Sequence, residues 1–128
     1  NIQAVLANND GMALGAVQAL EEQKLTGKVF VAGADADLTA VKNILKGKQT
    51  MTVLKGIKPL AEGAVTAAIQ LAKKEPVASD SKAFNGKKEV PVVNTPVYRV
   101  VKDNIQQQII DYGFHAESAV YGESGRGT

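Results

Sequence analysis

The sequence has no cysteine and no tryptophan, and its aromatic residues are three Phe and three Tyr among 128 residues. The absence of cysteine excludes disulfides and thiolate chemistry, and it leaves the redox compartment open. A strong charge of one sign is also absent, because 15 Lys and Arg against 13 Asp and Glu leave a net charge of +2. This weak excess is spread along the chain, so we expect no nucleic-acid partner and no membrane-surface partner.

Strand and helix signals alternate along the chain, whose length suits one domain. Apolar runs bounded by turn residues predict strands at 2–7, 28–33 and 49–55. The first run is apolar as a whole, which is typical of a strand buried on both faces. Helical spacing of apolar residues predicts helices at 12–24, 38–45, 59–74 and 104–114. This alternation favours an α/β fold, with a parallel sheet flanked by helices.

The stretch after the third predicted helix has a different character. Pro76 and the polar run behind it mark a surface connection, in which Asn85 and Gly86 predict a hairpin turn. Residues 90–101 are expected to be extended, and the tail at 123–128 is expected to be disordered.

Polar side chains follow each of the three predicted parallel strands. Residues 8–10 come after the first strand, Asp35 and Asp37 after the second, and Lys55 after the third. Because ligands of open α/β sheets bind beyond the carboxyl ends of the strands, these side chains are expected on one rim. An amide, a carboxylate and an ammonium together match neighbouring hydroxyls of a polyol, each of which donates and accepts. A phosphate suits this set less well, because the carboxylates would repel it.

Each of these residues also has a purely structural interpretation. Asp10 is expected to cap a helix or shape a turn, Asp37 to cap the helix that follows it, and Lys55 taken alone to be a solvated lysine. His115, the only histidine, is expected in a capping or surface role, because no nucleophile motif accompanies it. A metal site built from Asp35, Asp37 and His115 lacks a recognised ligand spacing. We therefore expect no metal, no cofactor and no enzymatic activity.

Several stretches resemble one family. "ANNDGMALGAVQAL" (7–20) is similar to a motif in the C-terminal lobe of periplasmic sugar-binding proteins of the ribose and xylose type. "GKVFVAGADAD", "TMTVLK", "NTPVYRVVKDNI" and "DYGFHAES" resemble the D-xylose-binding members that serve ABC transporters. The resemblance runs in register over nearly the whole chain. It implies the type I periplasmic-binding-protein fold, here as a partial Rossmann-like lobe, and it implies that Asn9, Asp35 and Lys55 contact a sugar.

The resemblance also implies that this chain is a portion of a longer, two-lobed protein, roughly its C-terminal half. Residues 1–55 would form a βαβαβ segment of the C-terminal lobe, and residues 56–89 would pack on the N-terminal lobe. Residues 90–128 would supply the return strand, the final helix and the tail. The N-terminal half would come from the same protein or from a companion fragment, and a membrane anchor would lie in it.

The function implied by the resemblance is capture of a monosaccharide, with D-xylose or a related aldose such as glucose or ribose as ligand. Such a receptor would work in the periplasm or outside the cell, with an ABC permease or a membrane sensor as partner. One alternative is the effector-binding domain of a LacI-type transcription regulator, although no helix-turn-helix sequence is present. Another is a phosphoacceptor receiver domain with Asp35 and Lys55 at its site. That function needs an acidic pair after the first strand, and residues 8–10 supply one acid.

Overall fold

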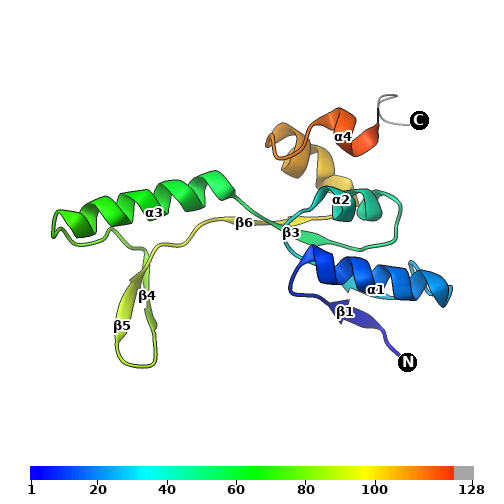
Figure 1. Ribbon diagram of the computed structural model, residues 1–128, viewed down its shortest axis with the longest axis horizontal. Helices are drawn as coiled ribbons and strands as arrows, with labels where there is room; N and C mark the ends of the chain where they lie inside the picture. The colour runs from blue at the N-terminus through cyan, green and yellow to red at the C-terminus, as the bar shows by residue number, and fades with distance from the viewer. Residues whose placement is uncertain (123–128) are drawn as a thin grey trace. The chain divides into compact units, whose positions relative to one another are not determined.

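The computed structural model describes residues 1–122 and divides into two compact units (Figure 1). The first unit contains residues 1–54 and the residues from Tyr98 onward, and the second contains Lys55–Val97. Residues 90–97, expected with the return segment, are grouped with the second unit. The chain therefore leaves the first unit at the end of strand β3 (Thr52–Lys55) and re-enters it in strand β6 (Val97–Val100).

Parallel strands form the framework of the first unit. Strand β1 (Ala4–Leu6) pairs in parallel with strand β2 (Phe30–Ala32). An isolated parallel bridge joins Ala32 to Met51, directly before β3, and β3 pairs with β6. The polar segments that follow β1 and β2 consequently lie at the same edge, the carboxyl ends of these strands.

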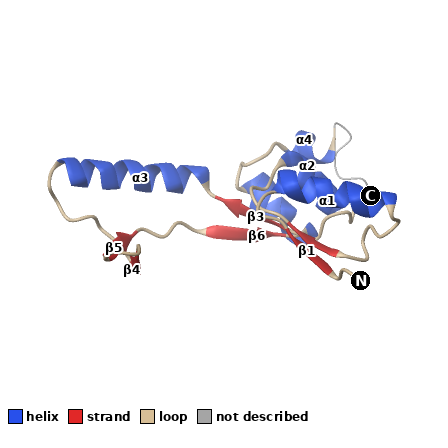
Figure 2. Ribbon diagram, turned by 60° about the horizontal axis from the view of Figure 1, so that its bottom comes forward, coloured by secondary structure: helices blue, strands red, loops and turns tan. Residues whose placement is uncertain are grey.

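The helices of the first unit follow its strands in the predicted order. Helix α1 (Asp10–Glu22) begins two residues before the predicted start at Met12, and helix α2 (Leu38–Leu45) has the predicted bounds. The two helices contact each other and lie on the same side of the strands (Figure 2). Gly47 follows α2 with φ +71°, a left-handed conformation that ends helices and that glycine adopts without strain.

The core of the first unit consists of two clusters of buried apolar side chains. The smaller cluster joins α1 to β2 and contains Ala13, Val17 and Val31. The larger cluster joins α2 to the strands and to the C-terminal segment and contains Ala36, Val41, Ile44, Leu54, Val100, Ile105, Ile109 and Val120. The loop residue Ala36 is therefore part of the core, which anchors the loop at the end of β2.

The prediction that the first strand is buried on both faces is wrong. Val5 packs against the core cluster under α1, whereas Leu6 is 79% exposed and Phe30 on the paired strand is 39% exposed. Successive side chains of a strand point to opposite faces, so α1 covers only the face that carries Val5 and Val31.

The segment after β6 is helical in a different way from the prediction. In place of one helix at 104–114, a 3₁₀ turn at Lys102–Asn104 precedes a π-helix at Gln106–Asp111. Gly113 follows with φ +78°, and the short helix α4 (Glu117–Tyr121) comes after it. Sequence periodicity did not predict α4, because five residues are too few to show a helical pattern. The tail at 123–128, expected to be disordered, lies outside the described residues.

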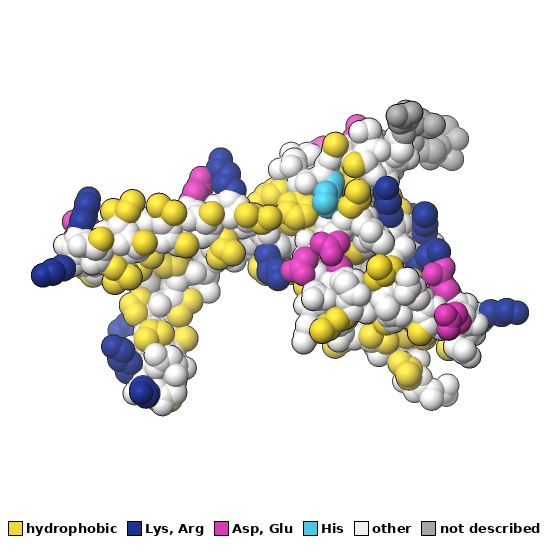
Figure 3. Space-filling model, in the orientation of Figure 1, with side chains coloured by type: hydrophobic (Ala, Val, Ile, Leu, Met, Phe, Trp, Pro, Cys, Tyr) yellow, Lys and Arg dark blue, Asp and Glu magenta, His cyan; other side chains and the backbone are white. Residues whose placement is uncertain are grey.

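Helix α3 (Ile57–Ala72) dominates the second unit, close to the predicted helix at 59–74. Pro59 lies in its first turn, where an N–H group would have no partner inside the helix. In the described part of the chain α3 has no buried residue, and apolar side chains line it in Figure 3. Five of them are at least half exposed: Ile57, Leu60, Val65, Ile69 and Leu71.

The second unit also contains the predicted hairpin. Strands β4 (Ser81–Phe84) and β5 (Glu89–Val92) pair antiparallel, and Asn85 and Gly86 open the turn between them. The Asn85 side-chain oxygen accepts from two backbone N–H groups of the turn, each at 3.1 Å, and Gly86 has φ +92°. The hairpin prediction is confirmed.

Candidate functional site

Asn9 lies at the N-terminus of α1, directly after β1. Its Oδ1 accepts from the Met12 N–H at 2.8 Å, which makes Asn9 the N-cap of α1. The side chain is exposed, and beyond the capping oxygen it carries an amide nitrogen with two donors. Asn9 therefore combines a structural role with a donor group at the edge of the strands.

Asp10 is a buried junction and not the simple turn or cap residue that the sequence suggests. Its side chain is 3% exposed. Oδ2 accepts from the Thr52 hydroxyl at 2.8 Å and from the Asp37 N–H at 2.9 Å, and Oδ1 accepts from the Gln49 amide at 3.0 Å. Asp10 thus ties the start of α1 to the loop after β2 and to the start of β3.

The burial of Asp10 changes its titration. Desolvation raises the pKa of the Asp10 carboxyl above its ordinary value, and the nearby Asp37 carboxylate raises it further. Hydrogen bonds from Thr52, from the Asp37 backbone and from Gln49 lower the pKa, and burial is the larger effect. The protonated form of Asp10 is therefore favoured in the folded chain relative to an exposed aspartate.

Gly33, at the end of β2, leaves the space that the Asp10 carboxylate occupies. A Cβ at this position would lie 2.1 Å from Asp10 Oδ1, 3.0 Å from Gln49 Nε2 and 3.1 Å from Ala13 Cβ. Heavy atoms do not approach to 2.1 Å without a bond between them. Gly33 is required for close approach and not for an unusual backbone angle.

The loop after β2 carries Asp35 in an uncommon backbone conformation. Asp35 has φ +105° and the next residue, Ala36, has φ +56°, a region that residues with a Cβ rarely adopt. The Asp35 N–H donates to the Val53 carbonyl at 2.8 Å, and the side chain is half-buried. Strained backbone of this kind is concentrated at functional sites, where the surrounding structure holds it.

Two side chains from distant parts of the chain bind the peptide groups of Ala36. Its N–H donates to the Thr52 hydroxyl at 3.2 Å, and its carbonyl oxygen lies 2.8 Å from His115 Nε2. Because a carbonyl oxygen only accepts, His115 Nε2 must carry the proton in this contact. His115 is therefore a partner of the Asp35 loop, and not only the capping or surface residue that the sequence predicts.

The loops after β1 and β2 are joined directly as well. The Asp10 N–H donates to the Ala34 carbonyl at 2.7 Å, which places the Asn9 segment beside the Asp35 segment. Asp37 stands at the N-cap position of α2, but its side chain makes no capping hydrogen bond, which corrects the cap prediction. The Asp37 side chain is exposed, and its backbone N–H is the group that Asp10 binds.

Lys55 ends strand β3 and is the first residue of the second unit. Its side chain is exposed. An ammonium group at this point supplies three donors.

Sequence reasoning missed Gln49 and Thr52 as partners of the site. One signal was available for Thr52, a polar residue between the apolar Met51 and Val53, and its side chain is fully buried. Nothing in the local pattern indicates that its partner is Asp10, 42 residues earlier.

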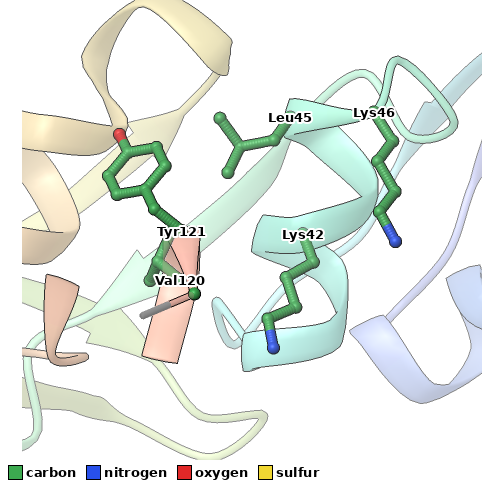
Figure 4. A pocket seen from close by; sticks show the side chains of 6 residues that line it. Lys42, Leu45, Lys46, Val120 and Tyr121 are labelled. Carbon is green, nitrogen blue, oxygen red and sulfur yellow. The ribbon is translucent and has the colours of Figure 1, made fainter. Parts of the chain in front are cut away.

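A surface pocket lies elsewhere in the first unit. It has a volume of about 380 Å³ and lies between α2 and α4 (Figure 4). Lys42, Leu45 and Lys46 line it from the C-terminal end of α2, opposite to the end that the Asp35 loop precedes. Among residues 1–122 no group of three or more His, Cys, Asp or Glu side chains could hold a metal ion. In the same part of the chain no helix is long and apolar enough to span a membrane.

Comparison with known proteins relates this arrangement to one family. The periplasmic binding protein domain matches residues 1–76. The D-xylose-binding periplasmic proteins of Haemophilus influenzae and Escherichia coli are 45% and 47% identical to the chain, over 94% and 91% of its length. The chain spans 36% of the length of each of these relatives.

A solved structure agrees with these matches. A carbohydrate transporter solute-binding protein from Chloroflexus aurantiacus, in complex with D-glucose, superposes with a TM-score of 0.82 at 35% identity. The superposition covers 91% of this chain and 34% of that protein. The first unit has parallel strands with helices between them and polar loops at the strand ends, and the family match covers more than half of the chain. The chain therefore belongs to the periplasmic binding protein family, with the type I fold.

Proposed function

We propose that this chain is the C-terminal portion of the solute-binding component of an ABC sugar importer, which binds D-xylose or a related aldose between two lobes. The observation that carries the proposal is the similarity, over nearly the whole chain, to two D-xylose-binding periplasmic proteins. The C. aurantiacus protein, in complex with D-glucose, supports an aldose as the ligand class. These relatives are binding and transport proteins, which supports capture without chemistry and does not support the transcription-regulator alternative.

Three residues are proposed to contact the sugar from this portion. The Asp35 carboxylate would accept from two neighbouring hydroxyls, and charge-assisted bonds of this kind are among the stronger hydrogen bonds in proteins. The Asn9 amide and the Lys55 ammonium would donate to sugar oxygens. The half-buried position of Asp35 and its fixed backbone support this role.

The rest of the protein is proposed to supply the other lobe. The relatives are nearly three times as long as the matched region, and the exposed apolar residues of α3 are suited to packing on a further domain. Residues 56–89 are the segment that we assign to this contact. The periplasm is the proposed location, an ABC permease the proposed membrane partner, and a membrane anchor would belong to the part before this chain.

Titration calorimetry on the full-length protein tests the proposal. We expect D-xylose to bind with a Kd of about 1 µM or lower, which corresponds to about −8 kcal/mol. D-glucose and D-ribose serve as the competing aldoses. Failure of all three to bind, together with binding of an amino acid or a phosphate ester, would show that the ligand class is wrong.

A further inference from the structure

Both peptide groups that follow Asp35 are bound by side chains. The first, between Asp35 and Ala36, donates its N–H to the Thr52 hydroxyl at 3.2 Å. The second, between Ala36 and Asp37, is held on both sides, because its carbonyl oxygen lies 2.8 Å from His115 Nε2 and its N–H donates to the Asp10 carboxylate at 2.9 Å. The Thr52 hydroxyl in turn donates to Asp10 at 2.8 Å, so these contacts form one connected network.

The backbone in this loop needs such support. Positive φ angles at two successive residues with side chains, +105° at Asp35 and +56° at Ala36, persist only where the surrounding structure holds them. An extended strand or a helical turn at these residues would turn the Asp35 carboxylate in another direction. The conformation therefore determines where this carboxylate lies.

We propose that Thr52, Asp10 and His115 are positioning residues for ligand recognition, which hold Asp35 in the orientation that binds the sugar. The inference rests on the proposed function, since it assumes that Asp35 is a ligand contact. Binding is tighter when the recognition group is already oriented in the free protein, because less conformational freedom is lost on binding.

Thr52 is the residue through which the network is best tested. It is fully buried, and its hydroxyl both accepts from the loop and donates to Asp10. Valine has nearly the shape of threonine and removes both hydrogen bonds, whereas serine keeps the hydroxyl and loses only a methyl group. The pair Thr52→Val and Thr52→Ser therefore separates the hydroxyl from the packing.

The experiment measures D-xylose affinity of the full-length protein by calorimetry. If loss of the hydroxyl leaves one molecule in ten with Asp35 correctly placed, the Kd rises about tenfold. We expect a rise of this size or more in Thr52→Val and recovery to near the wild-type value in Thr52→Ser. Hydrogen exchange at the amides of Ala36 and Asp37, measured without sugar, should accelerate in Thr52→Val alone.

Thr50→Val is the matched control. The Thr50 hydroxyl also accepts from a backbone N–H, that of Val31 at 3.0 Å, but this bond lies in β2 and not in the Asp35 loop. We expect its loss to leave the Kd unchanged. His115→Gln and His115→Ala form a second pair, because the glutamine amide keeps a donor near the Ala36 carbonyl and alanine does not. Weaker binding is expected in His115→Ala than in His115→Gln.

The outcomes distinguish this inference from the proposed function. If the wild-type protein binds none of the three aldoses, the proposed function fails and the inference fails with it. If the wild-type protein binds D-xylose and Thr52→Val and His115→Ala bind it equally well, only the positioning inference is overturned. If Thr50→Val raises the Kd as much as Thr52→Val does, the positioning inference is also overturned, because the loss of affinity would then follow a general loss of stability.

Discussion

At the scale of single residues, the two acids of the site have opposite surroundings. Asp10 is buried among three donors, whereas Asp35 is half-buried in a loop with positive φ. Their expected tasks differ accordingly, since Asp10 organises the chain and Asp35 is proposed to meet the ligand. Substitutions at the two positions should therefore affect different measurements.

Asp35→Ala should weaken D-xylose binding by the full-length protein by about 2–5 kcal/mol, the scale of losing a buried charged partner. Its effect on the free energy of unfolding should be small, because the side chain is not part of the core. Calorimetry and denaturant unfolding measure the two quantities separately. Asp37→Ala is the control, and its exposed side chain makes no cap bond, so stability should change by less than about 0.5 kcal/mol. If Asp37→Ala loses affinity and Asp35→Ala keeps it, the sugar contact is Asp37 and not Asp35.

Gly33→Ala should destabilise the full-length protein by about 2 kcal/mol or more, because the new Cβ overlaps the buried Asp10 carboxylate. Gly15→Ala is the matched control, since nothing lies within 4 Å of a Cβ at that position in α1. There alanine should raise stability by up to about 1 kcal/mol, through its better helix propensity. Denaturant unfolding checks both, and equal stability of the two variants would contradict the close approach at Gly33.

The raised pKa of Asp10 predicts a pH dependence of stability. A carboxyl whose pKa is higher in the folded than in the unfolded protein stabilises the fold below the unfolded value. This contribution is lost as the pH rises through the folded pKa. Asp10→Asn removes the titration at this position.

The measurement is the free energy of unfolding of the wild type and of Asp10→Asn from about pH 4 to about pH 7. Relative to Asp10→Asn, the wild type should lose stability as the pH rises. A difference that grows in favour of the wild type at higher pH would show that the hydrogen bonds outweigh burial.

At the scale of elements, helix α1 and the site share one residue. Asn9 caps the helix with its oxygen, and its amide nitrogen is proposed to serve the ligand. Asn9→Ala should lower the free energy of unfolding by about 1 kcal/mol through the lost cap. Asn9→Asp keeps a capping acceptor but removes the donor, so it should retain stability and lose affinity. Parallel unfolding and calorimetry measurements test this separation, and full affinity in Asn9→Asp would exclude the amide as a contact.

Loop lengths explain why polar groups of α1, α2 and β3 meet. Short connections place each helix start directly at a strand end, and the parallel pairing of β1 and β2 brings these ends side by side. Asp10 at the first helix start then reaches the second helix start and β3 with one side chain. The geometry is a property of the pairing and not of any one element.

At the scale of the whole molecule, the chain spans about a third of the length of its relatives and has an exposed apolar helix, α3. Residues 1–128 expressed alone should therefore bind an apolar fluorescent dye, aggregate on heating and unfold over a broad range, since their apolar surface has no cover. The full-length protein should do none of this. Light scattering and calorimetric melting compare them, and a sharp, reversible two-state melt of the isolated chain would refute the prediction.

The sequence by itself determined the order of strands and helices from β1 to α3, the bounds of α2, the hairpin at Asn85 and the family. These features depend on residues that are close in the chain, through helical periodicity, turn preference and capping. It also indicated which loops hold the candidate site.

Only the tertiary structure decided which side chains support that site. Asp10 binds Gln49 and Thr52 at separations of 39 and 42 residues, and the His115 contact with Ala36 spans 79 residues. The tertiary structure also decided that one face of β1 is exposed and that Asp37 makes no capping hydrogen bond. The physical reason is that burial and hydrogen-bond partners depend on the packing of elements far apart in the chain, while local patterns report only the preference of each element.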